Sequence, residues 1–401
     1  MFAWIKPFRQ GHNISLIIAF MVLSPFTHAL EVSTKVGIST YLFQHEPLYS
    51  EQHRQQWSVL AEPEFYHSWN NDLDSIIFKP YARVDQHDKE RTHFDIRELM
   101  WLHVGTEWEL RTGIGKVFWG VNEANHLVDI INQDDQVDDI SGDPKLGQAM
   151  INLSLIRDWG IIDFFILPGF RERTFSGAEG RLRGPLPIDT DHAEYESSRE
   201  EKHIDFALRW SYTFDDYDMG LYYFRGTNRD PGFLLRESPK GESNLIPYYD
   251  QIDQFGLDFQ ATLEAWLWKL EILHRKDEFD HFAAVSGGLE YTFVGVMDSV
   301  TDLGVIMEYS WDERDDPRLS QFQNDLMLGA RFAFNDAQST EILAGLVQDL
   351  DYSELRSFQI EASRRLGDDW KLNLALRLFS DHELNPISND DHLQLTLEKY
   401  F

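Results

Sequence analysis

Apolar and polar residues alternate with a period of two along most of this chain, in segments of about ten residues. Between positions 204 and 214, apolar residues occupy every second place, and Asp205 and Arg209 lie between them. Successive side chains of a strand point to opposite faces, so such a segment predicts a β-strand with one apolar and one polar face. Similar segments occur at 255–263, 266–272, 326–334 and 372–378.

Alternation alone does not separate a soluble β-sandwich from a membrane β-barrel, because both contain strands with one apolar face. Two features of this chain favour the barrel. The alternation repeats over nearly the whole length with charges in almost every polar face, and no long segment has a helical period. We predict strands near 34–43, 57–66, 75–85, 94–105, 107–119, 147–157, 161–169, 203–214, 217–226, 246–263, 265–275, 283–294, 300–311, 322–334, 338–349, 353–365, 369–380 and 391–401.

The connections between these segments alternate in length. Even-numbered connections are short and contain turn-forming residues, as at 70–72 and 215–216. Odd-numbered connections include the long segments 120–146, 170–202 and 227–245. Short turns on one side and long loops on the other are typical of outer-membrane barrels. We therefore predict an all-β fold: a transmembrane antiparallel up-and-down β-barrel of about 18 strands, with about 16 as the alternative.

The end of the sequence fits this prediction. Leu393, Leu395 and Leu397 alternate with polar residues up to Phe401. A terminal aromatic residue resembles the signal that the barrel-assembly machinery reads, so Phe401 is our candidate assembly signal. Lys399 stands where such barrels usually have an apolar residue, although a lysine at an interface can extend its amine to water.

Residues 1–29 have the composition of a secretory signal peptide. Lys6 and Arg9 precede the short apolar run 14–26, and a small residue, Ala29, ends the segment. The run is shorter than the roughly 20 residues of a membrane-spanning helix. We therefore expect export, cleavage after Ala29, and a barrel formed by residues 30–401 in a Gram-negative outer membrane.

Composition narrows the classes of function. The chain has 36 basic and 68 acidic residues, and its net charge of −32 would repel nucleic acid. The absence of Cys excludes a disulfide framework, a lipoprotein anchor and a cysteine nucleophile. No Gly-x-Ser-x-Gly sequence occurs, and no His pair has metal-ligand spacing with a supporting carboxylate. We expect a protein that is not an enzyme, with no catalytic residue, no metal and no cofactor.

The long connection 120–146 is a candidate constriction, because a barrel of this size encloses a wide lumen unless something enters it. One interpretation is that this acidic loop lies inside the pore and favours cationic or neutral solutes. The other is a solvated external loop that is acidic because the whole chain is acidic. Its acidic residues, set against Lys145 alone, are Glu123, Asp129, Asp134, Asp135, Asp138, Asp139 and Asp143.

Charges of both signs lie on the predicted inner face. They can set a field across a pore, or they can pair with one another across adjacent strands. A dense arginine ladder is not visible, so strong anion selectivity is not expected. The residues that we predict to line the pore or its constriction are Arg97, Arg111, Lys116, Asp129, Asn132, Asp134 and Arg209.

The least generic stretch is Gly115-Lys116-Val117-Phe118-Trp119-Gly120, followed by Leu127-Val128-Asp129-Ile130-Ile131-Asn132-Gln133-Asp134. It resembles the "glycine, basic, two residues, Trp-Gly … Asp-x-x-Asn-x-x-Asp" signature of a poorly characterised group of proteobacterial outer-membrane barrels. These are distantly similar to alginate-export and phosphate-selective porins. Many members carry Pro where this chain has Gln133. The resemblance implies a transport-type channel for larger or hydrophobic solutes and does not identify the solute.

Together these observations predict a porin-like outer-membrane channel for passive or substrate-preferring solute passage. Two alternatives stay open: a plugged barrel that serves as an exit or structural component of an envelope export system, and an outer-membrane barrel hydrolase. The expected partners are outer-membrane lipids, the barrel-assembly machinery and an unidentified small-molecule or lipid-like solute, and no nucleic acid. Self-association into a homo-oligomer also stays open.

Overall fold

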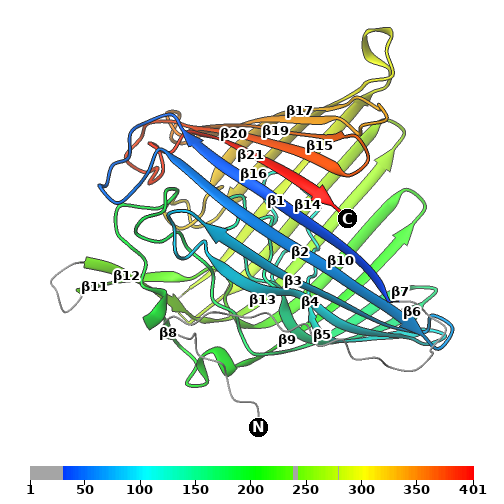
Figure 1. The fold of residues 1–401 in the computed structure, drawn as a ribbon. Helices are drawn as coiled ribbons and strands as arrows, with labels where there is room; N and C mark the ends of the chain where they lie inside the picture. Colours follow the sequence, from blue (N-terminus) through cyan, green and yellow to red (C-terminus); the bar gives the residue numbers. More distant parts are fainter. Residues whose placement is uncertain (1–29, 238–242, 279) are drawn as a thin grey trace.

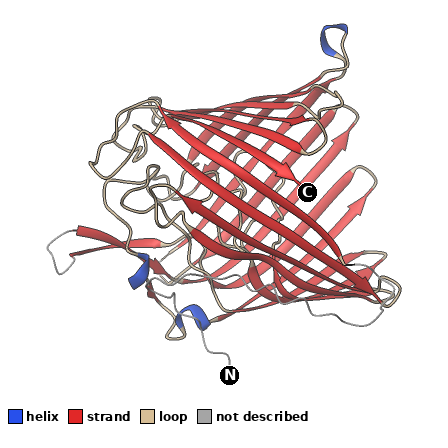
Figure 2. Ribbon diagram, in the orientation of Figure 1, coloured by secondary structure: helices blue, strands red, loops and turns tan. Residues whose placement is uncertain are grey.

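The computed structural model describes residues 30–237, 243–278 and 280–401. The predicted signal peptide, residues 1–29, lies outside the described residues. Within them, eighteen antiparallel strands form one closed sheet, and three further strands form a separate small sheet (Figures 1 and 2). No helix in the described part of the chain is long and apolar enough to cross a membrane.

The eighteen strands follow one another around the wall in chain order. β21 pairs with β1, from Tyr400 opposite Lys35 to His392 opposite Phe43, and this pairing closes the barrel. The predicted fold class is confirmed. The wall strands are β1 (Glu31–Phe43), β2 (Gln55–Trp69), β3 (Asp74–Asp85), β4 (His93–Val104), β5 (Trp108–Gly115), β6 (Gln148–Arg157), β7 (Gly160–Pro168), β9 (Ile204–Phe214), β10 (Tyr217–Thr227), β13 (Gln251–Leu263), β14 (Trp266–Lys276), β15 (His281–Phe293), β16 (Asp302–Asp312), β17 (Asn324–Ala333), β18 (Glu341–Asp349), β19 (Arg356–Leu366), β20 (Trp370–Phe379) and β21 (His392–Tyr400).

The predicted strand 246–263 is wrong, because the chain forms two strands there. β12 (Ser243–Tyr249) leaves the wall and pairs with β11 (Gly232–Glu237) and β8 (Glu194–Tyr195), whereas β13 belongs to the barrel. Pro247 has no backbone N–H to donate, which makes this segment unsuited to a wall strand with neighbours on both sides. The small sheet projects beside the barrel on the side of the long connections (Figure 1).

Short turns join the strands at the end of the barrel opposite the long connections (Figure 1). Asn70, Asp215 and Asn335 adopt left-handed backbone conformations in three of these turns, with φ of 56°, 48° and 53°. Asn and Asp tolerate this conformation better than other residues with side chains do. The predicted alternation of short turns and long loops is confirmed.

Lys399, the departure noted in the last strand, lies at the short-turn end of the wall. Its Nζ is 3.1 Å from Oδ2 of Asp369, in the turn between β19 and β20. It also lies 5.0 Å from the centroid of the Trp370 ring. The charge is therefore paired at the rim rather than buried in the apolar outer face.

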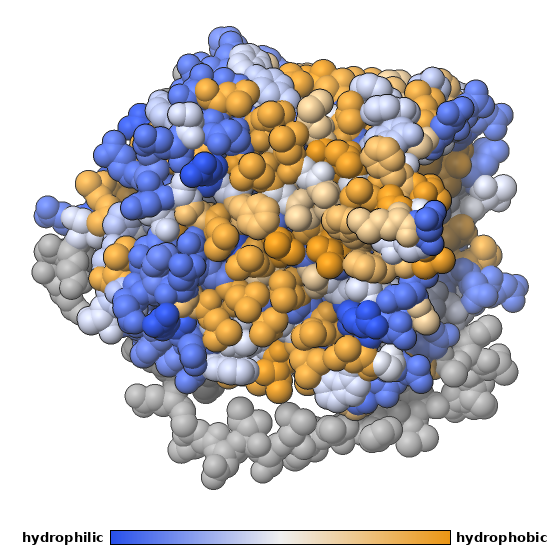
Figure 3. Space-filling view, turned by 90° about the horizontal axis from the view of Figure 1, so that it is seen from above, coloured by the Kyte–Doolittle hydropathy of each residue, from blue (hydrophilic) through white to orange (hydrophobic). Residues whose placement is uncertain are grey.

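The outer face of the wall is apolar in its middle. Val59, Phe164, Leu208 and Leu328 come from four different strands and are exposed. Figure 3 shows hydrophobic side chains covering the middle of the barrel on this side, with hydrophilic side chains toward its two ends. The residues between these outward positions point to the opposite face of each strand and therefore face the interior, and they carry most of the charges of the wall.

Candidate functional site

The connection between β5 and β6, residues 116–147, folds into the barrel, and we call it the inner loop. The predicted strand 107–119 is therefore too long, because β5 ends at Gly115 where the chain turns inward. Asn122 of the inner loop donates its backbone N–H to Glu271 of β14, with an N–O distance of 2.9 Å. The backbone N–H of Glu123 donates to the carboxylate of Glu308 of β16, at 2.8 Å. The inner loop thus reaches across the interior to the far wall.

The first half of the inner loop fills one side of the interior with apolar side chains. The ring of Trp119 packs on Tyr222 of β10, with 4.9 Å between centroids. Such a cluster has no room for a continuous water path. Its buried members from the loop and from β6, β7, β9, β10 and β13 are Trp119, Val128, Ile130, Ile131, Met150, Phe165, Leu167, Ala207, Tyr222, Phe224 and Ile252.

Asp129 and Asn132 hold the inner loop in this shape. Oδ1 of Asp129 accepts the backbone N–H of Trp119 at 2.7 Å. Nδ2 of Asn132 donates to the carbonyl oxygens of Gly115 and Leu146, at 2.8 Å each, and so joins the start of the loop to its end. Burial raises the pKa of Asp129, against the opposing effect of its charged and N–H neighbours.

Arg97 of β4 anchors the second half of the inner loop. Its guanidinium lies 2.6 Å from Asp135 and 3.5 Å from Asp138, and Arg83 of β3 lies 2.6 Å from Asp138. Burial by itself would raise the pKa of Asp135. The imidazole of His93, whose Nε2 lies 3.4 Å from the carboxylate, and the charge of Arg97 outweigh burial and hold that pKa well below its usual range. The buried carboxylates therefore stay charged and bound to the wall.

A β-bulge in β4 determines where Arg97 lies. Lys79 of β3 is opposite Glu98, whereas Pro80 is opposite Ile96, so Arg97 is the extra residue. Pro80 has no N–H to donate to β4, which favours an interruption of the ladder here. Because a bulge disturbs the alternation of faces, it can turn a side chain toward a neighbour that regular alternation would not predict.

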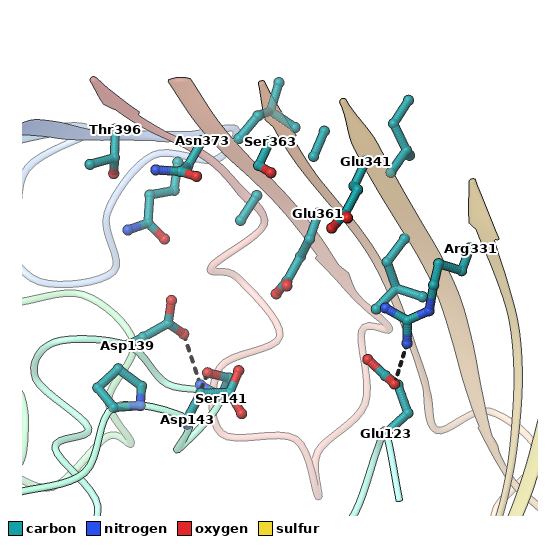
Figure 4. A pocket seen from close by; sticks show the side chains of 17 residues that line it. Glu123, Asp139, Ser141, Asp143, Arg331, Glu341, Glu361, Ser363, Asn373 and Thr396 are labelled. Atoms are coloured by element: carbon teal, nitrogen blue, oxygen red, sulfur yellow. Dashed lines mark hydrogen bonds and ion pairs between the residues drawn. The ribbon is translucent and has the colours of Figure 1, made fainter. Parts of the chain in front are cut away.

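A cavity of about 370 Å³ lies between the inner loop and the wall formed by β17 to β21, and we call it the slot. Figure 4 shows Asp139, Ser141 and Asp143 of the inner loop across from Asn373 and Glu361 of the wall. Five carboxylates and one cationic side chain line the slot: Glu123, Asp139, Asp143, Glu341, Glu361 and Arg331.

Arginines neutralise only part of this negative charge. Arg331 lies 2.5 Å from Glu123, and Arg377 lies 3.1 Å from Asp139 and 3.0 Å from Glu361. Within the described part of the chain, Asp143 forms an ion pair only with His126, at 3.9 Å, and Glu341 forms none. The slot therefore keeps an excess of negative charge.

A second cavity, of about 770 Å³, opens on the side of the long connections, and we call it the vestibule. Apolar side chains from three of these connections, Phe175, Leu319 and Leu384, contribute to its lining. The slot and the vestibule adjoin each other, because they share the lining residues Glu123, Ser141, Asp143, Leu343 and Glu361.

None of the seven predicted pore residues lines the slot or the vestibule. Arg97, Asp129 and Asn132 hold the inner loop, as described above. Asp134 joins them through Lys145, at 2.6 Å, and Arg173, at 3.1 Å.

The other three lie on or near the wall. Arg209 forms a bidentate pair with Asp258, at 2.6 and 2.8 Å, under the ring of Trp119. Arg111 pairs with Glu109 of its own strand, at 2.8 Å. Lys116 begins the inner loop, and burial lowers its pKa.

Sequence reasoning missed the residues that receive the inner loop on the far wall. Glu271 and Glu308 are inward positions of alternating strands, like many others, and no local signal separates them from the rest. Asp135 had a signal: it lies three residues after Asn132, where the Asp-x-x-Asn-x-x-Asp signature ends.

Comparisons with known proteins agree with this fold. No family model matches the chain, and no curated protein matches it in sequence. Among solved structures, Pseudomonas aeruginosa OpdQ has a TM-score of 0.51 at 11% identity, covering 93% of this chain and 96% of that chain. Pseudomonas aeruginosa OccD3 (OpdP) also has a TM-score of 0.51, at 10% identity, with 94% and 91% covered. A variant of the Rh. blastica porin has a TM-score of 0.45 at 9% identity, with 93% and 100% covered.

Proposed function

We propose that this protein is a porin-like outer-membrane channel through which small solutes diffuse passively along the vestibule and the slot. The wall supports a membrane location, since a closed barrel leaves no strand edge unpaired and its outer face is apolar in the middle. The barrel fold shared with OpdQ and OccD3 supports the same location.

The observation that carries the proposal is that two adjoining cavities together follow a single wall strand, β18, from end to end. Asp349, the last residue of β18, lines the vestibule on the side of the long connections. Glu341, the first residue of β18, lines the slot on the side of the short turns. A solute could therefore pass beside the inner loop without displacing it.

The lining of the slot favours cationic or neutral solutes. Its five carboxylates exceed the cations that contact them, and a constriction lined by carboxylates attracts cations and repels anions. Small polar residues on the facing wall, such as Ser363, Asn373 and Thr396, can exchange hydrogen bonds with a passing solute. The inner loop is the constricting element in this proposal.

Planar-bilayer recording of the refolded chain without residues 1–29 tests the channel. We expect discrete current steps, and in a KCl gradient a reversal potential that indicates preference for K⁺ over Cl⁻. A protein that is folded, β-rich and heat-modifiable but carries no current would contradict the proposal.

Glu361→Gln tests whether the slot sets the ion preference. It removes one lining carboxylate at nearly constant size, so the K⁺ over Cl⁻ permeability ratio should fall by up to about fivefold, the effect of ~1 kcal/mol. Asp216→Asn, in the turn between β9 and β10, removes the same charge away from both cavities and should leave the ratio unchanged. Equal effects of the two variants would attribute selectivity to overall charge instead.

The seven residues predicted from sequence enter this proposal mainly as residues that position the constriction. Arg97, Asp129, Asn132 and Asp134 would set the width of the slot by fixing the inner loop, and Arg209 would support the wall beneath it. The same loop residues carry the resemblance to barrels related to alginate-export and phosphate-selective porins. We include that kinship in the proposal on this basis.

A second candidate function is a plugged barrel that opens only with a partner of an export system. The apolar cluster around Trp119 favours it, because this side of the interior is dry and closely packed. Recording separates the two candidates, since a plugged barrel gives no current until its partner is added.

A further inference from the structure

Two buried carboxylates face each other near the mouth of the vestibule. Asp325 of β17 lies directly opposite Asp349 of β18 in the sheet, each side chain lines the vestibule, and each residue is only 5% exposed. Like charges directly opposite each other destabilise a sheet, and burial increases the cost of each charge. The pair therefore needs a compensating positive charge.

No described side chain supplies that charge. The arginines of the neighbouring loop are engaged elsewhere: Arg314 lies 2.5 Å from Asp312, and Arg318 lies 2.7 Å from Asp316. Within the described residues, neither Asp325 nor Asp349 forms an ion pair with Lys, Arg or His.

The hydrogen bonds to the two carboxylates come from neutral groups. Asp349 accepts backbone N–H groups of Asp351 and Tyr352, at 2.9 and 2.8 Å. Among the described residues, Asp325 accepts only the backbone N–H of Asn324, at 3.2 Å. These donors orient the carboxylates but leave both negative charges uncompensated.

Gln323 adds an independent observation. The residue is 1% exposed, and its amide touches the pair, because Nε2 donates to Asp349 at 2.9 Å. Its Oε1 is buried and accepts no hydrogen bond. An orphaned amide oxygen is costly to bury, and it is a good ligand for a hard cation.

We infer that Asp325, Asp349 and the amide oxygen of Gln323 form a binding site for a divalent cation, Ca²⁺. Two carboxylates and an amide oxygen are ligands that Ca²⁺ takes in proteins, and water from the vestibule can complete its shell. No group of three or more Asp, Glu, His or Cys side chains in the described chain is arranged to hold a metal, and this site has only two carboxylates. A low count of charged ligands favours weak binding. Extracellular sites of modest charge bind Ca²⁺ with Kd of about 10⁻⁴ to 10⁻³ M.

Bound Ca²⁺ would join β17 to β18 where the connection 313–323 ends and the connection 350–355 begins. It would also cancel the charge of two carboxylates in the vestibule lining. The site is independent of conduction, because the folded barrel alone presents it.

Calorimetric titration of Ca²⁺ into the refolded, lipopolysaccharide-free protein in detergent tests the site. We expect one saturable site per chain, and Asp325→Asn or Asp349→Asn should each weaken it by at least about tenfold. Gln323→Ala should weaken it by a smaller factor. The matched control is Asp315→Asn, which removes an exposed carboxylate from the adjacent loop and should leave the affinity unchanged.

A second measurement covers variants that refold poorly. Ca²⁺ should raise the temperature at which the folded wild-type band converts to the unfolded band, since a ligand bound only to the folded state stabilises it. Gln323→Ala should show a smaller rise. Absence of binding by the wild type at about 10 mM Ca²⁺, well above the expected Kd, would overturn the inference and favour a proton shared by the two carboxylates. Because no current is measured, this result would leave the channel proposal untouched.

Discussion

Arg97 is buried inside the barrel and remains charged because two carboxylates of the inner loop lie within 3.5 Å of it. The pKa of Asp135 is held below its usual range, so its charged form stabilises the folded loop. That contribution is fully present above about pH 4, the pKa of an unfolded Asp, and is lost only as the pH falls through the lower folded pKa. The anchor should therefore persist throughout the neutral and mildly acidic range.

Arg97→Gln should release the second half of the inner loop. Removing one partner of a buried ion pair costs about 3–5 kcal/mol, because Asp135 is left as an uncompensated buried charge. We expect flickering single-channel currents at pH 7 that decrease on acidification, since the pKa of Asp135 would rise and protonation would remove its uncompensated charge. The wild type should stay quiet down to about pH 5. Arg54→Gln, which breaks an exposed pair with Glu46, is the control and should record like the wild type.

At the scale of elements, the packing of neighbouring strands depends on small residues that leave room for the side chains of other strands, as well as on large residues. Arg209 of β9 reaches over β10 to Asp258 of β13, and Gly220 is the β10 residue beneath this bridge. A Cβ at Gly220 would lie 2.2 Å from Nη2 of Arg209 and 2.3 Å from Oδ2 of Asp258. The glycine is thus required for an ion pair that spans three strands.

Gly220→Ala should displace that ion pair and destabilise the wall by about 1–3 kcal/mol, the usual cost of overpacking. The measurement is the temperature at which the folded band converts to the unfolded band in semi-native electrophoresis, which should fall. Gly232→Ala, where the nearest heavy atom to the added Cβ is 3.9 Å away, should leave it unchanged. Equal shifts in both variants would contradict the spatial argument.

At the scale of the whole molecule, the interior has two unlike sides. The apolar cluster closes the side of β6 to β13, and the slot lies along β17 to β21. Because the inner loop folds toward the side of β6 to β13, a solute path would lie along the opposite wall.

Single cysteines can test this asymmetry, because the chain contains no Cys of its own. Ser363→Cys in the slot should react with a charged, water-soluble thiol reagent and lose current. Ala207→Cys faces the interior from β9 but lies in the apolar cluster at 6% exposure, so it should stay unreactive while the barrel is folded. Reaction of both cysteines at similar rates would mean that the filled side is open to water.

Much of the fold could be predicted from sequence, and less of the site. The alternation at 204–214 predicts β9, which spans Ile204–Phe214, almost to the residue. The same reasoning predicted one strand where the structure has β12 and β13, because the alternation continues across Asp250. The two strands are separated only by their partners, since β12 pairs with β11 and β8 whereas β13 pairs with β10 and β14. Arg97 was chosen for its charge on an inward strand, and the bulge that gives it two loop carboxylates as partners has no local signature.

The pattern of residues along the chain is enough to specify alternating strands, because the two faces of a strand are set by backbone geometry within a few residues. The entry of residues 116–147 into the barrel, and the side of the interior on which the slot remains, depend instead on tertiary contacts. Those outcomes depend on contacts such as Asn122 with Glu271, which are 149 residues apart in the chain. Such groups meet only in the closed barrel, where the buried carboxylates of the far wall accept the backbone N–H groups that the loop provides.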